Sequence, residues 1–313
     1  MSTGKTVRLF LVDGTPGGLL TAEIMNWTGH IVAAPRSDLG ELIKRPETSR
    51  TGIYILIGDD PESVDGQIAY VGEGDDVSKR LYYHGRPEDQ GGKDFWDRAI
   101  VITSKDTNLT KAHARYLESR FISLGLQANR AKLTNSTSPE PIVLPEADVS
   151  DMEYFIEQAR IVLPVLGVNI FRSPIVVSTQ PTDFPAAHDA TVSPVFELRL
   201  RKPGILATAQ EIDGEFTVRA GSTARLKPAG AGGHSYIGLR EKLERDGTLA
   251  PSSGGMTMQF TRNQVFASPS AAAAVVTGRS ANGRNEWVTQ EGSLTYGDWQ
   301  RQGVDEALKE TAV

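Results

Sequence analysis

Two apolar runs typical of β-strands stand out in the first third of the chain, TGIYILIG (51–58) and QIAYVGEG (67–74). The loop between them is polar and rich in Asp, Pro and Gly, so the two runs predict a β-hairpin. Alternation directs Tyr54 and Tyr70 out of the sheet on defined faces. Tyrosine is common in half-buried strands, so the hairpin alone indicates no function.

Two elements with chemically useful side chains follow the hairpin. DVSKRLYYH (76–84) is typical of a short helix, which places Arg80 and His84 on one face because they are four residues apart. FWDRAIVITS (95–104) is an apolar strand.

A strong amphipathic helix is predicted over 108–128, with Asn108 or Thr110 as its cap. Its apolar stripe consists of Ala114, Leu117, Phe121 and Leu124. Glu118 lies beside that stripe, where a carboxylate is costly unless a partner neutralises it.

In chain order, these polar residues and one later asparagine resemble the GIY-YIG nuclease domain over roughly residues 50–140. The resemblance implies a small mixed sheet flanked by helices and metal-dependent hydrolysis of DNA phosphodiesters. Each motif is weak when taken alone, and the ordered set carries the likeness. Its members are Tyr54, Tyr70, Arg80, His84, Glu118 and Asn135.

The resemblance also implies roles for the hairpin tyrosines and the histidine. Tyr54 is similar to the tyrosine proposed in the family as general base or as the group that positions the attacking water. Tyr70 matches the second motif tyrosine, and His84 occupies a place filled by tyrosine or histidine. A tyrosine with an ordinary pKa of about 10 needs a nearby cation to act as a base near neutral pH. Whether Tyr54 or His84 takes the proton stays open.

The remaining residues are implied to handle charge. Arg80 is similar to the arginine that stabilises the phosphate, and Glu118 to the single metal-binding carboxylate, for Mg²⁺ or Mn²⁺. Asn135 is similar to the late asparagine that supports the site. One carboxylate is enough for Mg²⁺ because this ion keeps several waters and takes other ligands from phosphate. Glu73 departs from the excision-repair member of the family, which has lysine there, and so puts that enzyme's phosphate contacts in doubt.

Composition limits the other classes of function. The chain has no cysteine, which excludes disulfides and thiolate zinc sites, and its five histidines show no zinc-site spacing. No apolar run reaches membrane length and no signal-peptide layout is present, so we expect a cytoplasmic protein without a membrane partner. Residues 136–196 hold eight acidic and two basic side chains, so this segment has a net charge of −6, the same as the whole chain. The near-neutral remainder does not predict tight non-specific DNA binding.

The predicted fold class is α/β (α+β), with a small mixed-sheet nuclease domain and a second small α+β domain. We expect a strand–helix extension over residues 1–50, with helices at 19–27 and 37–47, and the nuclease domain over 51–172. The nuclease domain ends in a helix over 150–167 capped by Ser150. A Pro/Ser/Thr-rich linker is expected over 173–194, and the C-terminal domain over 195–313.

The C-terminal part resembles a small domain of uncharacterised function that often follows GIY-YIG domains in bacterial proteins. More loosely, it resembles a domain associated with restriction enzymes and adenine methylases. Four polar residues cluster near a helix predicted to begin at Ser268-Pro269 and near the turn after it, where they could contact phosphates or bases. They are Arg262, Arg279, Asn282 and Arg284. Trp287 is expected to be a core anchor rather than a base-stacking residue.

We therefore expect a metal-dependent DNA endonuclease, acting in restriction, defence or repair, whose C-terminal domain recognises the substrate or a partner. Two alternatives stay open. The protein could be a nucleic-acid-binding module without turnover, or a subunit of a restriction or defence system that is silent until its protein partners assemble. The sequence does not indicate the oligomeric state.

Overall fold

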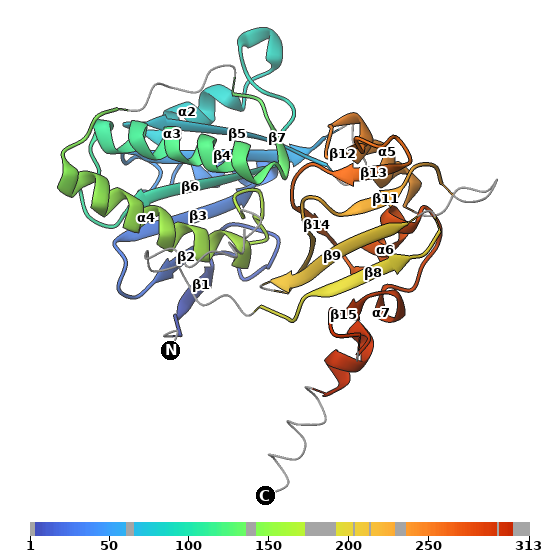
Figure 1. The fold of residues 1–313 in the computed structure, drawn as a ribbon. Coiled ribbons are helices and arrows are strands. Elements are labelled where there is room, and N and C mark those ends of the chain that lie inside the picture. Colours follow the sequence, from blue (N-terminus) through green and yellow to red (C-terminus); the bar gives the residue numbers. More distant parts are fainter. Residues whose placement is uncertain are drawn as a thin grey trace, which may run out of the picture. The chain divides into compact units, whose positions relative to one another are not determined.

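A computed structural model describes residues 4–302 except 61–65, 136–141, 173–191, 203, 213, 229–235 and 293. The chain divides into two compact units, one of residues 3–173 and one that consists mainly of residues 174–313. Figure 1 shows the course of the chain. The mixed α/β class expected from the sequence is confirmed. None of the helices in the described residues is both long and apolar enough to cross a bilayer.

The first unit contains one seven-stranded sheet with strand order β1-β2-β3-β6-β4-β5-β7. All neighbouring strands are antiparallel except β5 and β7, which run parallel. Its strands are β1 Val7–Leu11, β2 Leu20–Ile24, β3 Gly29–Pro35, β4 Gly52–Asp59, β5 Gln67–Gly74, β6 Arg98–Ser104 and β7 Ala131–Leu133. The N-terminal residues thus extend the sheet that contains the predicted hairpin, because β3 pairs with β6 along its whole length.

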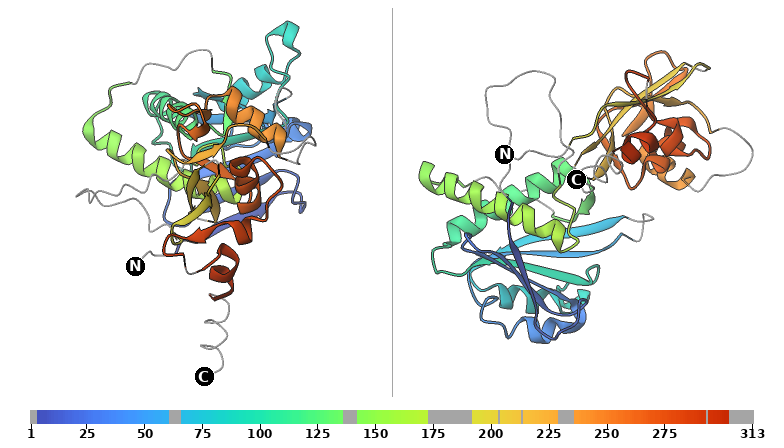
Figure 2. Two further views of the ribbon diagram at one scale, coloured as in Figure 1. Left: turned by 45° about the vertical axis from the view of Figure 1, so that its right-hand side comes forward. Right: turned by 90° about the horizontal axis from the view of Figure 1, so that it is seen from below.

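Helices cover both faces of this sheet. On one face lie α3 (Lys111–Ala128), against β4 and β5, and α4 (Glu146–Val165), against β2 and β3. On the other lie α1 (Leu39–Leu42) and α2 (Val77–His84), with the 3₁₀ turns η1 (Arg36–Asp38) and η2 (Glu88–Gln90). The right-hand view in Figure 2 shows α3 and α4 together on one side of the strands.

Alternation along β4 separates the two cores. Ile53, Ile55 and Ile57 belong to the core under α3 and α4, whereas Tyr54 and Leu56 belong to the core under α1 and α2. The hairpin is in the predicted position, with Tyr54 opposite Gly72 and Leu56 opposite Tyr70. Period-two alternation in a sheet covered on both faces therefore decides which side Tyr54 occupies.

Helix α3 confirms the predicted amphipathic helix and selects Thr110 as its cap. The Thr110 side chain accepts a hydrogen bond from the His113 amide, and His113 Nδ1 accepts one from the Thr110 amide. Reciprocal bonds of this kind satisfy two amides that the first turn leaves free. Asn108 instead bonds to Asp106 just before the helix.

Three expectations about local structure were wrong. Residues 20–24, expected to be helical, form β2, because Leu20, Ala22 and Ile24 point into one core and β1 and β3 pair on either side. The helix expected over 37–47 shrinks to η1 and the single turn of α1. Helix α4 begins at Glu146, after Pro145, so Ser150 lies inside the helix and is not its cap.

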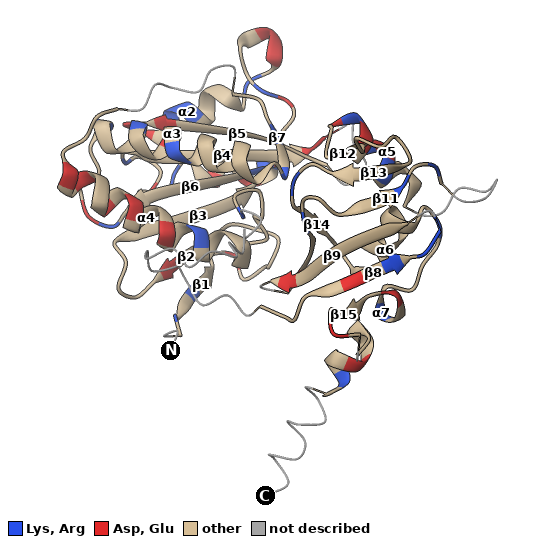
Figure 3. Cartoon of the chain, viewed as in Figure 1, with Lys and Arg blue, Asp and Glu red and all other residues tan. Residues whose placement is uncertain are grey.

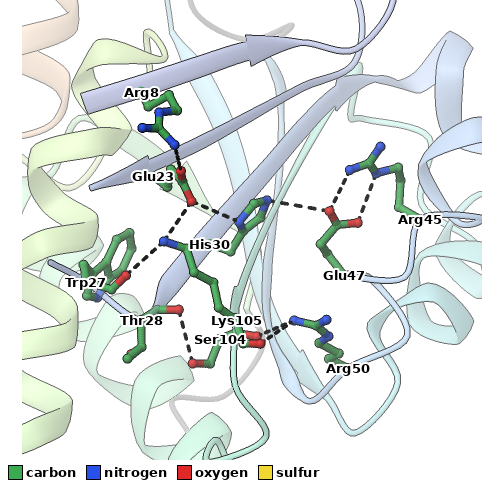
Figure 4. A network of polar contacts seen from close by, with 10 residues as sticks. All are labelled: Arg8, Glu23, Trp27, Thr28, His30, Arg45, Glu47, Arg50, Ser104 and Lys105. Atoms are coloured by element: carbon green, nitrogen blue, oxygen red, sulfur yellow. Dashed lines mark hydrogen bonds and ion pairs between the residues drawn. The ribbon is translucent and has the colours of Figure 1, made fainter. Parts of the chain in front are cut away.

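A polar network joins the N-terminal strands to the segment that precedes β4 (Figure 4). His30 on β3 lies between two carboxylates, with Nδ1 3.9 Å from Glu23 and Nε2 3.7 Å from Glu47. Lys105 pairs with Glu23 at 2.8 Å, and Arg45 pairs with Glu47 at 2.6 Å. Each carboxylate is therefore already paired with a lysine or an arginine, so protonation of His30 is not needed to balance their charges.

This arrangement predicts a specific loss of stability in mild acid. Burial lowers the pKa of His30 below its ordinary value of 6.5, despite the nearby carboxylates. A lowered histidine pKa contributes stability above pH 6.5, and this stability is lost as the pH falls because the unfolded chain takes up the proton first. Between pH 8 and 5, the melting temperature of His30→Gln should fall less than that of the wild type. Parallel curves would contradict this role.

The second unit has two sheets, with orders β14-β10-β9-β8-β15 and β11-β13-β12. Apolar residues from both sheets and from α6 share one core, in which Trp287 is fully buried, as expected. The described helices are α5 Ile237–Arg245, α6 Pro269–Thr277 and α7 Gly283–Glu286, and residues 296–302 are also helical. The strands are β8 Phe196–Leu200, β9 Ile205–Ile212, β10 Glu215–Val218, β11 Thr223–Arg225, β12 Leu249–Pro251, β13 Thr257–Phe260, β14 Gln264–Phe266 and β15 Val288–Thr289.

Candidate active site

The hairpin and α2 bring Tyr54, Tyr70 and His84 together. The Tyr54 hydroxyl and His84 Nε2 are 2.8 Å apart and share a buried hydrogen bond. The Tyr70 ring centroid lies 6.1 Å from that of Tyr54 and 5.4 Å from that of His84. Helix α2 can supply His84 because its first turn is capped by Asp76 and its apolar face buries Val77 and Leu81. Residues that are 30 positions apart in sequence therefore meet at one point on the α2 face of the sheet.

Two motif glycines make room for this cluster. A Cβ atom on Gly72 would lie 2.4 Å from the Tyr54 hydroxyl oxygen, because the Tyr54 ring crosses β5 at that residue. A Cβ atom on Gly74 would lie 2.9 Å from Cγ of Arg80. The glycines thus allow a tyrosine and an arginine to lie directly against the backbone of β5.

We expect Gly72→Ala to displace Tyr54 and to reduce the activity of the site at least tenfold. It should also lower the free energy of unfolding by about 1–3 kcal/mol, the usual range for overpacking a tight core. Gly40→Ala is the matched control because a Cβ atom there would meet nothing within 4 Å. Measured melting temperatures and DNA cleavage rates of the two variants test this, and wild-type values for Gly72→Ala would contradict it.

Burial makes both members of the Tyr54–His84 pair neutral near pH 7. The pKa of Tyr54 is raised well above its ordinary value, first by burial and then by Tyr70, against the opposing effect of Arg80. The pKa of His84 is lowered to about 4, first by burial and then by the positive charges of Lys93 and Arg80. His84 Nδ1 is buried without a hydrogen-bond partner among the described residues. The pair is therefore a protonated phenol beside a neutral imidazole.

Arg80 supplies the positive charge at this pair. Its side chain begins against Gly74, and its charge and hydrogen bonding act on the Tyr54 hydroxyl. The pKa of Arg80 is raised, chiefly by its interaction with Tyr54 and more weakly by Tyr70 and Glu73. A guanidinium held beside two phenols is placed to neutralise an anion such as a phosphate.

Glu118 on α3 faces the same end of the site. Burial raises the pKa of its carboxyl from 4.5 to about 7, and the negative charge of Glu73 adds to the shift. Arg80 opposes the shift, and the charge of Glu118 in turn raises the pKa of Tyr70, so these groups are close enough to influence one another. Within the described residues Glu118 makes no ion pair, so its charge is left for another cation.

Two lysines that sequence reasoning missed complete the charge balance. Lys111, at the start of α3, pairs with Glu73 at 2.6 Å. Lys93 places its ammonium 4.3 Å from the centre of the Tyr70 ring. Glu73, which raised doubt in the sequence, is thus neutralised by a cation from another element. Only the alternation of β5, which turns Glu73 to the α3 face, could have hinted at this pairing.

Asn135 supports the edge of the hairpin and is not directed at the reacting groups. Its side-chain amide donates to the Val71 carbonyl at 2.7 Å and accepts from the Val71 amide at 3.1 Å. These two bonds imitate a further strand residue beyond β7. Asn135 therefore braces the backbone of β5 next to Tyr70.

The polar side chains of this site could bind a divalent ion only through one carboxylate, that of Glu118. No group of three or more His, Asp or Glu side chains in the described part of the chain could hold a metal. Glu118 is a desolvated oxygen donor with no ion pair to any described residue, which suits an ion such as Mg²⁺ that keeps several waters. On this basis Glu118 would be the protein ligand, and substrate oxygens and water would supply the others.

A separate cavity of about 310 Å³ lies on the other face of the sheet, where Trp27 and Phe155 form part of its wall. His113 also lines it, but the hydrogen bonds of His113 belong to the cap of α3. None of the six predicted site residues lines this cavity. The tyrosine–histidine site is instead built around the C-terminal end of α2.

The four proposed nucleic-acid contacts in the second unit are engaged in local structure. The Asn282 side chain caps α7, and Arg279 pairs with Glu286 at 2.6 Å. Arg284 packs against Gly297. Arg262 lies after β13, where it bonds to Thr248 and pairs with Asp246 at 3.3 Å. Contact of these four residues with nucleic acid stays a prediction, and Asn282 also serves as the cap of a helix.

Comparison with known proteins identifies only the second unit. A family model described as a domain of unknown function (DUF4357) matches residues 196–300. This confirms the expected C-terminal domain of uncharacterised function. No family model of the GIY-YIG nucleases matches. Searches of curated proteins and of solved structures each found no match. The nuclease resemblance of the first unit therefore depends on its residues and their geometry.

Proposed function

We propose that the first unit is a metal-dependent DNA endonuclease that hydrolyses phosphodiester bonds. The observation that carries the proposal is the buried Tyr54–His84 hydrogen bond of 2.8 Å, with Arg80 beside the hydroxyl. A neutral proton acceptor, a polarised hydroxyl and a fixed cation are the groups that attack of water on a phosphate needs. Glu118 adds a carboxylate that lacks an ion pair within the described residues.

In the proposed reaction, the Tyr54 oxygen accepts a hydrogen bond from the attacking water. As the water attacks phosphorus, its proton passes to the Tyr54 oxygen and the phenolic proton passes to Nε2 of His84. This transfer uses the tautomer in which Nε2 accepts, and it never requires a free tyrosinate, whose formation burial opposes. Arg80 stabilises the charge that grows on the phosphate oxygens. The bond from phosphorus to the leaving oxygen breaks, its electron pair stays on that oxygen, and the oxygen takes up a proton from solvent water to become the hydroxyl end.

The carboxylate of Glu118 would hold the divalent ion at the phosphate. When bound, the ion would neutralise charge on the phosphate and on the leaving oxygen. Glu118 binds a cation only when deprotonated, and its pKa of about 7 keeps much of it protonated at neutral pH. Lys111 forms an ion pair with the neighbouring Glu73. The negative charge of Glu73 still opposes the ionisation of Glu118, but its carboxylate is already engaged with Lys111.

The proposal is tested with purified full-length protein on end-labelled single-stranded, duplex and branched DNA, in Mg²⁺ or Mn²⁺ and in chelator. We expect metal-dependent cutting that leaves phosphate and hydroxyl ends. Arg80→Ala should lower the cleavage rate by about a hundredfold or more, the usual cost of removing one charge-stabilising group. Arg8→Ala, which removes a largely exposed arginine of β1 at the far edge of the sheet, is the matched control. Equal rates for Arg80→Ala and the wild type would refute the assignment.

A binding module without turnover is the second candidate, and one observation favours it. With the pKa of His84 lowered to about 4, the site has only a weak proton acceptor. DNA binding by the wild type with no cutting in either metal would establish this alternative. Cutting that appears only with added proteins from the same system would instead mark a partner-dependent subunit, with the second unit as the partner- or substrate-recognition domain.

A further inference from the structure

Two consecutive tyrosines on α2 lie outside any core. Tyr82 is 57 % exposed and Tyr83 is 44 % exposed, whereas Leu81 and His84 on either side of them are buried. Large aromatic rings that are exposed side by side on a short helix are typical of a binding surface. The Tyr83 ring contacts the ring of His84, so one end of this pair lies next to the proposed active site.

Cations already lie over the aromatic rings of this surface. The Arg86 guanidinium is 5.1 Å from the centre of the Tyr82 ring and 5.4 Å from that of Tyr83. The Lys93 ammonium lies over Tyr70 in the same manner, at 4.3 Å. Tyr83 meets His84 edge-on at 5.9 Å, which makes the exposed rings continuous with the Tyr54–His84 pair. We call Tyr82, Tyr83 and Arg86 the tyrosine platform.

The platform is held in place by the loop that follows α2. The Lys93 amide donates to the His84 carbonyl at 3.0 Å, which closes the loop. A Cβ atom on Gly91, which has a φ of +83°, would lie 2.5 Å from the Tyr83 hydroxyl, so Tyr83 rests directly on the loop backbone. A platform that is ordered without its ligand loses less entropy when it binds.

Flat aromatic faces combined with cations suit one kind of nucleic acid. Unpaired bases stack on tyrosine rings, and nearby cations contact their phosphates, whereas bases in a duplex are already stacked on one another. Glu88 and Asp89, in η2 at the tip of the same loop, would repel a longer run of phosphates (Figure 3). Two exposed rings beside an acidic loop are therefore expected to favour a short unpaired stretch of one or two nucleotides.

We propose that the tyrosine platform binds unpaired nucleotides beside the scissile phosphate, so that the substrate is single-stranded or locally unpaired DNA. This inference rests on the proposed function, because the platform would bind the nucleotides that adjoin a phosphate bound at Tyr54 and His84. Tyr82 and Tyr83 stack on the bases, and Arg86 contacts the adjacent phosphate.

The test is the fluorescence anisotropy of a labelled single-stranded oligonucleotide and of the fully paired duplex of the same sequence, with full-length protein in chelator. We expect the wild type to bind the single strand more tightly. The double variant Tyr82→Ala/Tyr83→Ala should weaken that binding at least tenfold, as removal of two stacking rings predicts, and leave duplex binding unchanged. Tyr82→Phe/Tyr83→Phe keeps the rings and should bind like the wild type.

Tyr154→Ala is the matched control, because Tyr154 is a 51 % exposed tyrosine on α4, on the other face of the sheet. An oligonucleotide with abasic sites should lose the preference if stacking causes it. Equal binding of single strand and duplex, or wild-type binding by the double alanine variant, overturns the inference.

Cleavage assays distinguish failure of the platform from failure of the proposed nuclease. Tyrosine-dependent binding without cutting in any metal refutes only the nuclease, and equal cutting of both DNA forms by wild type and double variant refutes only the platform.

Discussion

Replacement of Glu118 with glutamine is expected to stabilise the first unit at pH 8 while abolishing DNA cleavage. The carboxyl is desolvated and lies near Glu73, which raises its pKa from 4.5 to about 7. A raised carboxyl pKa gives stability that is present below pH 4.5 and is lost as the pH rises to 7, because the folded protein then holds an unfavourable charge. Glutamine keeps the shape without the charge, and it cannot hold a divalent ion as a carboxylate does.

Thermal unfolding between pH 5 and 8 measures the stability part of this prediction. Allowing for solvent screening of a half-exposed group, we expect about 1 kcal/mol of stabilisation at pH 8 and almost none at pH 5. Glu157→Gln makes the same chemical change at an exposed site on α4 and should alter neither stability nor cleavage. A Glu118→Gln variant that is less stable than the wild type at pH 8 would mean that Glu118 has a structural partner.

The same shift gives a pH dependence for metal binding. Below pH 7 the proton on Glu118 competes with the metal, so the apparent affinity for Mn²⁺ should rise with pH up to about 7 and level off above it. A titration with Mn²⁺ from pH 6 to 8.5 measures this. A flat profile would show that the proton on Glu118 does not compete with the ion.

Tyr54→Phe and His84→Gln are expected to have equal effects that do not add. Each variant breaks the 2.8 Å hydrogen bond and removes one half of the proton transfer, so each should slow cleavage by about a hundredfold to ten-thousandfold. Once either half is missing, loss of the other changes little, because residues that act as a unit are not additive. The double variant should therefore cleave no more slowly than the slower single variant.

A double-mutant cycle on the single-turnover rate constants tests this coupling. Tyr154→Phe, at an exposed tyrosine, controls for loss of a phenolic hydroxyl elsewhere in the unit. Because the pKa of His84 is about 4, the imidazole is already neutral at pH 6, and its ionisation should not limit cleavage between pH 6 and 8. Fully additive losses would indicate that Tyr54 and His84 act independently.

Local pattern was sufficient for the elements that carry the site. The alternation of the hairpin placed Tyr54 and Tyr70, and the 3.6-residue period of α3 placed Glu118 beside its apolar stripe, both as the structure has them. These predictions succeed because a single period dominates each segment. The same reasoning failed for β2, whose residues have a preference for helix. This segment instead pairs with β1 and β3 on its two sides, and these tertiary contacts override the local preference.

Contacts between distant segments could not be predicted from the sequence. Apart from the alternation of β5, nothing in the sequence around Glu73 indicates that Lys111 neutralises it, and nothing around Tyr70 indicates that Lys93 covers its ring. Each pair joins residues from different elements, which become neighbours only when the sheet and helices have assembled. The pKa shifts of Glu118 and His84 have the same origin, because burial is their largest cause.

The most direct test of the central claim is the single-turnover cleavage rate of wild type and Glu118→Gln on the same labelled DNA, in Mn²⁺ and in chelator at pH 8. We expect cutting only by the wild type and only with metal, while Glu118→Gln stays folded and binds the DNA as tightly as the wild type. Cutting by Glu118→Gln at the wild-type rate, or cutting by the wild type in chelator, would contradict a metal-dependent nuclease site at Glu118.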